Sequence, residues 1–246
     1  MHRSIAPIAL ATAAATLCLT GCGGSNQATT TAPPAATSAS APATTAQPAK
    51  TYTNEDVSSI VSGLKDAQGN PLSVVPAAQI DQGLIAAREM LKTAVITPQA
   101  CGVLFDNNTQ VPEGSTYAAG TSVAGQAQTA TVITVFSVKD PSVMDAQFEK
   151  SSGALKDCSI YSVELKGQKI SNELKAVNAP VQADKSLAAL TIQTTPTGQK
   201  KVCNLTVMGV KGNLAVTAMK SGAVDAVTAN DAPELAKLVN TALAAG

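Results

Sequence analysis

Chemistry that depends on an imidazole ring is available at one position of this 246-residue chain, because His2 is its single histidine. Histidine general bases, Ser-His-Asp or Cys-His nucleophiles and histidine metal ligands all need such a ring. The thiols are more numerous and more widely spread. They belong to Cys18, Cys22, Cys101, Cys158 and Cys203. The residue types therefore favour cysteine chemistry over histidine chemistry.

Cys22 closes the sequence Leu19-Thr20-Gly21-Cys22, which resembles the lipobox of bacterial lipoproteins. Small residues before the cysteine let a signal peptidase reach the bond, and the thiol accepts a diacylglyceryl group. Arg3 precedes an apolar stretch over 5–19, which has the length of a signal h-region and is too short to span a bilayer. We predict a signal peptide over residues 1–21 and lipidation of Cys22. The alternative is an ordinary secretory signal with a chance cysteine.

Residues 22–51 follow as a stretch rich in Ala, Thr, Pro and Ser, with no charge before Lys50. Such a stretch cannot bury enough surface to offset its ordering entropy. We expect a disordered stalk, which serves either as a spacer through a cell-wall layer or as a simple linker. No later stretch is long and apolar enough to span a bilayer, so the lipid is the expected membrane attachment. This places the folded domain, residues 52–246, at the outer face of the cytoplasmic membrane.

An exported domain is expected to form disulfides, because compartments outside the cytoplasm are oxidising. Cys101, Cys158 and Cys203 permit one internal bond. Cys101 lies on the inner face of a short helix expected after Thr97-Pro98, and Cys158 ends a helix that points it at the core. We predict a Cys101–Cys158 disulfide and an unpaired, buried Cys203. The alternative is a Cys158–Cys203 bond, which leaves Cys101 free.

One enzymatic pattern occurs in the chain. Ser62-Gly63-Leu64-Lys65 fits Ser-x-x-Lys, and Lys220-Ser221-Gly222 fits the Lys-Ser/Thr-Gly of penicillin-recognising enzymes. The Ser-x-Asn element that belongs between them is absent, and Ser-x-x-Lys arises often by chance. A solvated helix face and the end of a strand explain the two segments better. We therefore predict that the protein is not an enzyme.

The sequence gives no strong sign of a metal, a cofactor or a nucleic acid. Asp106-Asn107-Asn108 resembles part of a calcium loop but lacks the spacing and the terminal Glu, so a turn explains it better. Arg88 could clamp an anion, but an exposed position at the edge of a helix face is the better explanation. Lys and Arg number 17 and Asp and Glu 17, a balance that excludes a strongly basic nucleic-acid binder.

Hydrophobic periodicity and turn residues predict the elements that position these side chains. Helices are expected over about 54–66, 80–95, 98–105 and 141–158 and after Asp231. Strands are expected over 72–75, 115–123, 128–138, 159–166, 169–177, 187–194, 201–210 and 213–220, with a hairpin around Lys211-Gly212-Asn213. This order predicts an α+β fold: a mainly antiparallel twisted sheet with helices packed on one face, in a single disulfide-stapled domain.

Three blocks of the chain resemble a known family. They are Ile96–Leu104 around Cys101, Thr131–Phe136 with the helix ending Leu155-Lys156-Asp157-Cys158, and Val202-Cys203-Asn204 with the hairpin and closing helix. Together, over roughly residues 96–246, they resemble the PknH-like extracellular sensor domain of actinobacteria. The resemblance implies a central antiparallel sheet, disulfides and a cleft for an unknown ligand.

Two departures separate this chain from the family pattern. Family members often carry an aromatic residue shortly before the second cysteine, where Leu155 is the nearest large residue here. They usually have two disulfides, whereas the second arm of this hairpin lacks a partner for Cys203. The Gly-rich loop, His-Arg-Asp and Asp-Phe-Gly of a kinase are also absent.

These features predict a membrane-anchored extracytoplasmic lipoprotein that acts as a non-enzymatic sensor or ligand-binding module. The few charges and many aliphatic side chains favour an apolar pocket, and a lipid or a cell-wall fragment is the expected ligand. The alternative is a structural or partner-binding envelope lipoprotein without a small ligand, which works beside a receptor kinase or another envelope protein. No ligand-binding residue stands out in the sequence.

Overall fold

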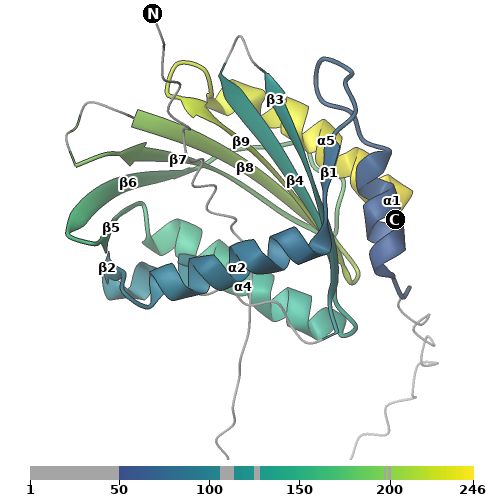
Figure 1. Cartoon of the computed structure of the whole chain (residues 1–246), viewed down its shortest axis with the longest axis horizontal. Helices are drawn as coiled ribbons and strands as arrows, with labels where there is room; N and C mark the ends of the chain where they lie inside the picture. Colours follow the sequence, from purple (N-terminus) through teal and green to yellow (C-terminus); the bar gives the residue numbers. More distant parts are fainter. Residues whose placement is uncertain (1–49, 106–113, 125–127, 197, 199–200) are drawn as a thin grey trace, which may run out of the picture.

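The structure, a computed structural model, describes residues 50–105, 114–124, 128–196, 198 and 201–246. The expected signal peptide, Cys22, the stalk up to residue 49 and the segment Asp106-Asn107-Asn108 lie outside these residues. The described part forms one twisted antiparallel sheet with helices on both sides (Figure 1). The α+β class with a mainly antiparallel sheet is therefore confirmed.

The sheet has nine strands in the order β1-β3-β4-β9-β8-β7-β6-β5-β2, and every neighbouring pair is antiparallel. The strands are β1 (Ser73–Val75), β2 (Val95–Thr97), β3 (Thr116–Ala124), β4 (Thr129–Ser137), β5 (Ile160–Leu165), β6 (Gln168–Ala176), β7 (Lys185–Thr194), β8 (Lys201–Lys211) and β9 (Leu214–Ala223). The short strands β1 and β2 therefore form the two opposite edges.

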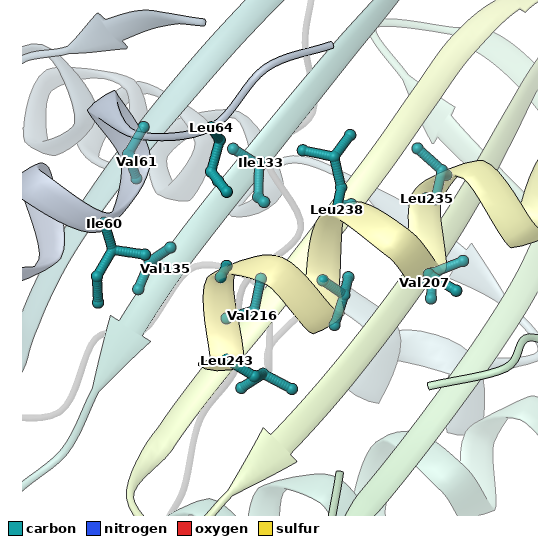
Figure 2. Close-up of a cluster of buried hydrophobic side chains, with 14 of the residues drawn as sticks. Ile60, Val61, Leu64, Ile133, Val135, Val207, Val216, Leu235, Leu238 and Leu243 are labelled. Atoms are coloured by element: carbon teal, nitrogen blue, oxygen red, sulfur yellow. The ribbon is translucent and has the colours of Figure 1, made fainter. Parts of the chain in front are cut away.

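Two helices cover what we call the first face of the sheet. α1 (Asn54–Ser62) starts with a capping box: the Asp56 N–H donates to Thr53 Oγ1 at 3.1 Å, and the Thr53 N–H donates to Asp56 Oδ2 at 2.8 Å. α5 (Ala232–Ala245) follows the short 3-10 turn η2 (Ala229–Asp231). Aliphatic side chains of both helices pack over β4, β8 and β9 (Figure 2). This layer is the main hydrophobic core.

The opposite, second face is covered only in part. α4 (Pro141–Asp157) begins at Asp140, whose side chain accepts from the Ser142 N–H, with Pro141 in the first turn. Met144 and Phe148 of α4 pack on Phe136 and Met208 of the sheet. α2 (Ala77–Leu91) lies near α4 on the same side in Figure 1 and buries only Leu84.

Helices therefore lie on both faces of the sheet, whereas the sequence analysis expected them on one. The physical reason is visible along β8, where side chains alternate between the faces. Val207 belongs to the core under α5, while Met208 and Val210 belong to the cluster under α4. At this end of the sheet both faces are apolar, so each needs a cover.

A second difference concerns the segment before Cys101. Val95 was expected on a helix and Thr97 as a helix cap, but both lie in β2 and pair with β5. The residue before a proline is disfavoured in helical conformation, which suits Thr97 to an extended strand. The helical turn η1 (Gln99–Gly102) begins only after Pro98. It still places Cys101 in the interior, at 1 % exposure.

The described chain enters the fold beside the β8–β9 hairpin. Asn213 is buried and its Nδ2 donates to the Lys50 carbonyl at 2.8 Å and to the Val138 carbonyl at 2.9 Å. Lys50 Nζ donates to the Gly246 carbonyl. Both ends of the described chain therefore meet at the hairpin end of the sheet. The predicted hairpin turn has Gly212 at a φ of +57°. The next residue of this turn, Asn213, makes the contact with Lys50.

Candidate functional site

The second face carries a group of uncharged polar side chains beyond the part that α4 covers. They come from β3, β4, β6, β7, β8 and β9 and lie toward the end of the sheet opposite the hairpin. We call this surface the open face. Its residues are Thr121, Val132, Thr134, Asn172, Thr191, Gln193, Asn204, Thr206, Thr217, Met219 and Ser221. All except the buried Asn172 are half-buried.

Strand register places these residues next to one another. Thr134 lies opposite Thr217, and Thr206 lies opposite Met219. Thr191 lies opposite Asn204, which in turn lies opposite Ser221. Paired strands are about 4.8 Å apart, so the side chains form a continuous surface across β4, β9, β8 and β7. Val132 and Met219 belong to none of the three hydrophobic clusters, which shows that the described core does not use them.

The open face holds unused hydrogen-bonding capacity. Within it, Ser221 Oγ donates to Asn204 Oδ1 at 2.6 Å. The hydroxyls of Thr191, Thr206 and Thr217 make no hydrogen bond to any other described side chain. Asn172 is only 3 % exposed, and its Oδ1 has no donor among the described residues. A buried amide oxygen without a partner is costly, so a donor from outside this part of the chain would stabilise it.

Helix α2 runs across the same side of the sheet from one edge to the other (Figure 1). It connects β1, which pairs with β3, to β2, which pairs with β5. Its contacts are few: Leu84 is its one buried residue, and the Tyr117 hydroxyl donates to the Asp81 carboxylate. Burial, followed by the hydrogen bond and charge of Asp81, raises the pKa of Tyr117 to about 12. α2 is therefore a strap held mainly at its ends and at Tyr117.

The cysteines support the fold and are not part of the open face. Cys101 and Cys158 form the predicted disulfide, with Cα atoms 5.7 Å apart, and both are 1 % exposed. Cys203 is unpaired and 1 % exposed on the first face. Burial, and then the charge of Asp231, raises the pKa of its thiol. A thiol that is buried and protonated is a poor nucleophile.

The penicillin-enzyme pattern is explained by structural contacts. Ser62 Oγ donates to the Ser59 carbonyl at 3.0 Å, as a helix residue often does. Lys220 Nζ lies 2.8 Å from Asp231 Oδ1 and 3.1 Å from Glu234 Oε2, which ties β9 to η2 and α5. Lys220 points to the first face, whereas its neighbour Ser221 belongs to the open face. Ser62 and Lys220 therefore make structural contacts, Lys65 is exposed, and the side chains of the pattern do not form one site.

Other candidate features are exposed or shallow. Arg88 is exposed on α2, as expected from its helix position. A hollow of about 400 Å³ lies between the 63–70 turn and α5 and is lined by Lys65, Glu234 and Lys237 among others. Within the described residues, no group of three His, Cys, Asp or Glu side chains could hold a metal ion. No helix found there is long and apolar enough to cross a membrane.

None of the residues of the open face was predicted as a ligand-binding residue from the sequence. A signal was nevertheless present, because polar residues stand at alternate positions of two predicted strands: 191 and 193, and 204 and 206. Alternation alone could not show that these positions share one face of one sheet. An apolar pocket was also expected. The apolar side chains Phe136 and Met208 of the second face are instead buried under α4.

Comparisons with known proteins give distant similarities. No family model matches the chain, and no curated protein matches it. The solved extracellular domain of PknH from Mycobacterium tuberculosis is 15 % identical, with a TM-score of 0.44 over 60 % of this chain and 75 % of that one. An uncharacterised Mycobacterium smegmatis protein, a Rv0999 ortholog, is 16 % identical, with a TM-score of 0.38 over 62 % and 75 %. Similarity at this level carries no information about a ligand.

Proposed function

We propose that this protein is a lipid-anchored, non-enzymatic module that binds a ligand on its open face, outside the cytoplasmic membrane. The anchor rests on the Leu19-Thr20-Gly21-Cys22 sequence, and the stalk over residues 23–49 separates it from the domain. The observation that carries the binding role is the open face itself. The hydroxyls of Thr191, Thr206 and Thr217 lie there without hydrogen-bond partners among the described side chains, beside the Ser221–Asn204 pair.

The chemistry of the described residues supports binding rather than catalysis. A hydrolytic site needs a nucleophile within hydrogen-bond reach of a base. The serine of the open face, Ser221, donates instead to Asn204, a neutral amide that cannot take its proton. Lys220 is held by two carboxylates, and Cys203 is buried. These groups position strands and helices, and a bound ligand would meet neutral side chains.

One observation favours the second candidate function, a partner-binding envelope lipoprotein without a small ligand. α2 exposes Ile85 at 57 % and Met90 at 45 %, on different sides of the helix. Exposed large apolar side chains can mark a contact with another protein. A receptor kinase or another envelope protein is the kind of partner that this candidate requires. Binding that is lost in Ile85→Asp but unaffected by changes to the open face would support it.

The deciding experiment is native mass spectrometry of the protein produced in an exporting actinobacterial host. We expect a diacylglyceryl mass on Cys22, absent from Cys22→Ser, which is then released from the membrane fraction. We also expect a further mass that denaturation removes. A double variant of the open face, Thr206→Asp with Thr217→Asp, should lose that mass and keep the lipid. A bare protein after incubation with envelope extracts would contradict the binding role.

A further inference from the structure

We infer that the open face binds an uncharged, polyhydroxylated ligand, that is, the neutral part of a glycan. The inference rests on the proposed function, because it names the ligand class of the same surface. It is drawn from three properties of the described residues: the sorting of charge between the two faces, the donors and acceptors on the open face, and the apolar side chains between them.

Side chains of a strand alternate between the two faces of the sheet. On β6 and β9 this alternation places the charged side chains on the first face and uncharged side chains on the open face. On β9, Lys220 points to the first face and pairs with Asp231 and Glu234, while Met219 and Ser221 on either side belong to the open face. On β6, the ion pair of Lys175 with Glu173 lies on the face opposite Asn172. A charged ligand would lose water without meeting a counter-charge, which is strongly unfavourable. A neutral ligand avoids that cost.

The charged side chains that the described contacts place on the second face lie outside the open face. Asp81 of α2 accepts from the Tyr117 hydroxyl. Lys185, at the hairpin end of β7, lies 3.0 Å from Asp145 Oδ1 and 3.4 Å from Glu149 Oε1. It is separated along β7 from Thr191 and Gln193 by Leu187 and Ala189, which pack in the clusters near α4 and the disulfide. The strand residues that form the open face therefore carry no charge themselves.

The polar groups suit a ligand that both donates and accepts hydrogen bonds. A threonine hydroxyl can do either, and an amide offers one acceptor and two N–H donors. Neighbouring strands place such groups about 4.8 Å apart, and alternate residues of one strand place them about 7 Å apart.

Apolar side chains complete the surface. Val132 and Met219 lie side by side in the register, with Thr206 next to Met219. Both are half-buried and belong to none of the hydrophobic clusters. The C–H faces of a sugar ring are apolar and could cover them while the ring hydroxyls meet the threonines. A lipid chain, in contrast, would leave the surrounding hydroxyls and amides unpaired, which costs binding energy.

The test uses the mature chain from residue 22 with Cys22→Ser and with ¹³C-labelled threonine methyl groups. The probes are neutral tetrasaccharides of glucose, galactose, arabinose and N-acetylglucosamine, and a sulfated glucose tetrasaccharide. We expect at least one neutral probe to shift the methyl signals of Thr191, Thr206 and Thr217. The sulfated probe should bind at least tenfold more weakly than its neutral counterpart. Tighter binding of the sulfated probe would overturn the inference.

Matched threonine variants show whether the hydroxyls make the contact. Valine keeps the shape of threonine and favours strands, so Thr191→Val and Thr206→Val preserve the fold. Each should weaken the neutral glycan about fivefold, the loss of one net hydrogen bond. Thr194→Val, on the same strand as Thr191 but on the first face, should change affinity less than twofold. Equal losses in Thr191→Val and Thr194→Val would contradict a specific contact.

The outcomes also separate the ligand class from the proposed function. If no neutral glycan binds, but the ligand retained in native mass spectrometry shifts the same methyl signals, the glycan inference is wrong and the proposed function stands. If the retained ligand shifts only signals around the hollow beside the 63–70 turn, both the open-face site and the glycan inference are wrong.

Discussion

Lys220 of β9 links the sheet to the last helical segment through two ion pairs. Its side chain is 14 % exposed and contacts two carboxylates that begin the last helical segment. Burial opposes its charge, but the contacts with Asp231 and Glu234 outweigh this effect and raise the pKa of Lys220. The same contacts lower the pKa of Asp231 against the effect of its burial. The ion pairs therefore fix α5 on the sheet.

We expect Lys220→Met to lower the free energy of unfolding by about 1–3 kcal/mol, because it leaves two partly buried carboxylates without their partner. Chemical denaturation at pH 7 measures the loss. Lys237→Met is the matched control, since Lys237 is an exposed residue of α5 in the same hollow. It should change the free energy by less than about 0.5 kcal/mol. Equal effects of the two variants would show that the ion pairs contribute nothing.

The pKa shifts set the pH range of this difference. The lowered pKa of Asp231 gives a contribution that is complete above its unfolded value of about 3.9 and is lost as the pH falls through the folded pKa. The raised pKa of Lys220 gives a contribution that is complete below about 10.4 and is lost as the pH rises through the folded pKa. The difference between wild type and Lys220→Met should thus be constant between these limits and shrink outside them.

The disulfide should contribute more than any single ion pair. Cys101 and Cys158 close a loop with a sequence separation of 57. In the chain-entropy model, such a loop stabilises by about 4 kcal/mol. We expect Cys101→Ala with Cys158→Ala to lower the free energy of unfolding by about that amount. Peptide mapping of the non-reduced wild type should yield the 101–158 pair, with Cys203 unlabelled by iodoacetamide until the protein is unfolded.

At the scale of elements, α2 is the weakest part of the described fold. It connects the two edge strands but buries only Leu84, so most of its backbone hydrogen bonds lack tertiary protection. The Tyr117–Asp81 hydrogen bond links it to β3 of the sheet. We expect its amides to exchange with solvent through local opening, well before the global unfolding of β7, β8 and β9.

Tyr117→Phe tests this expectation. Removing a hydrogen bond to a carboxylate should speed exchange over residues 77–91 about tenfold and leave global unfolding almost unchanged. Tyr161→Phe is the matched control, because Tyr161 is buried beside the disulfide and does not contact α2. Hydrogen exchange with mass spectrometry measures both. If exchange over 77–91 stays unchanged in Tyr117→Phe, the hydrogen bond does not hold the strap.

At the scale of the whole molecule, the chain enters and ends at the hairpin end of the sheet, while the open face extends toward the other end. Lys50 contacts Asn213 and Gly246. From Lys211 back to Asn204, at the far end of the open face, β8 rises about 3.3 Å per residue, a separation of roughly 20 Å from the tether. Thr217, at the near end, lies three residues from the start of β9. A ligand on the open face would therefore be presented away from the point where the stalk joins.

This separation predicts that the stalk and the domain act independently. We expect deletion of residues 23–49 to change the free energy of unfolding of the mature chain by less than about 0.5 kcal/mol. Asn213→Ala, in contrast, removes the contacts that hold the entering chain and should cost about 1–3 kcal/mol. Denaturant unfolding of the two variants compares these effects. A large loss on stalk deletion would show that residues 23–49 pack on the domain.

Features that depend on neighbours along the chain could be predicted from the sequence. The hairpin around Gly212, the helix start at Asp140-Pro141 and the last helix follow from turn and capping residues, and the structure contains each of them. The Cys101–Cys158 pairing also agrees, because both cysteines were placed at helix positions that face inward. The export signal and lipidation of Cys22 stay predictions of the sequence.

Which faces of the sheet are covered depends on how the strands and helices assemble. Alternation gives each strand two faces, but it does not tell which face of β8 shares a surface with which face of β4, since the strand order is non-local. β1 and β2 are close in sequence and lie at opposite edges of the sheet, which carries α2 across the second face. α4 covers the hairpin end of that face, and among the described residues the threonines of the open face are half-buried. Burial is a property of the assembled sheet, so no single strand could reveal it.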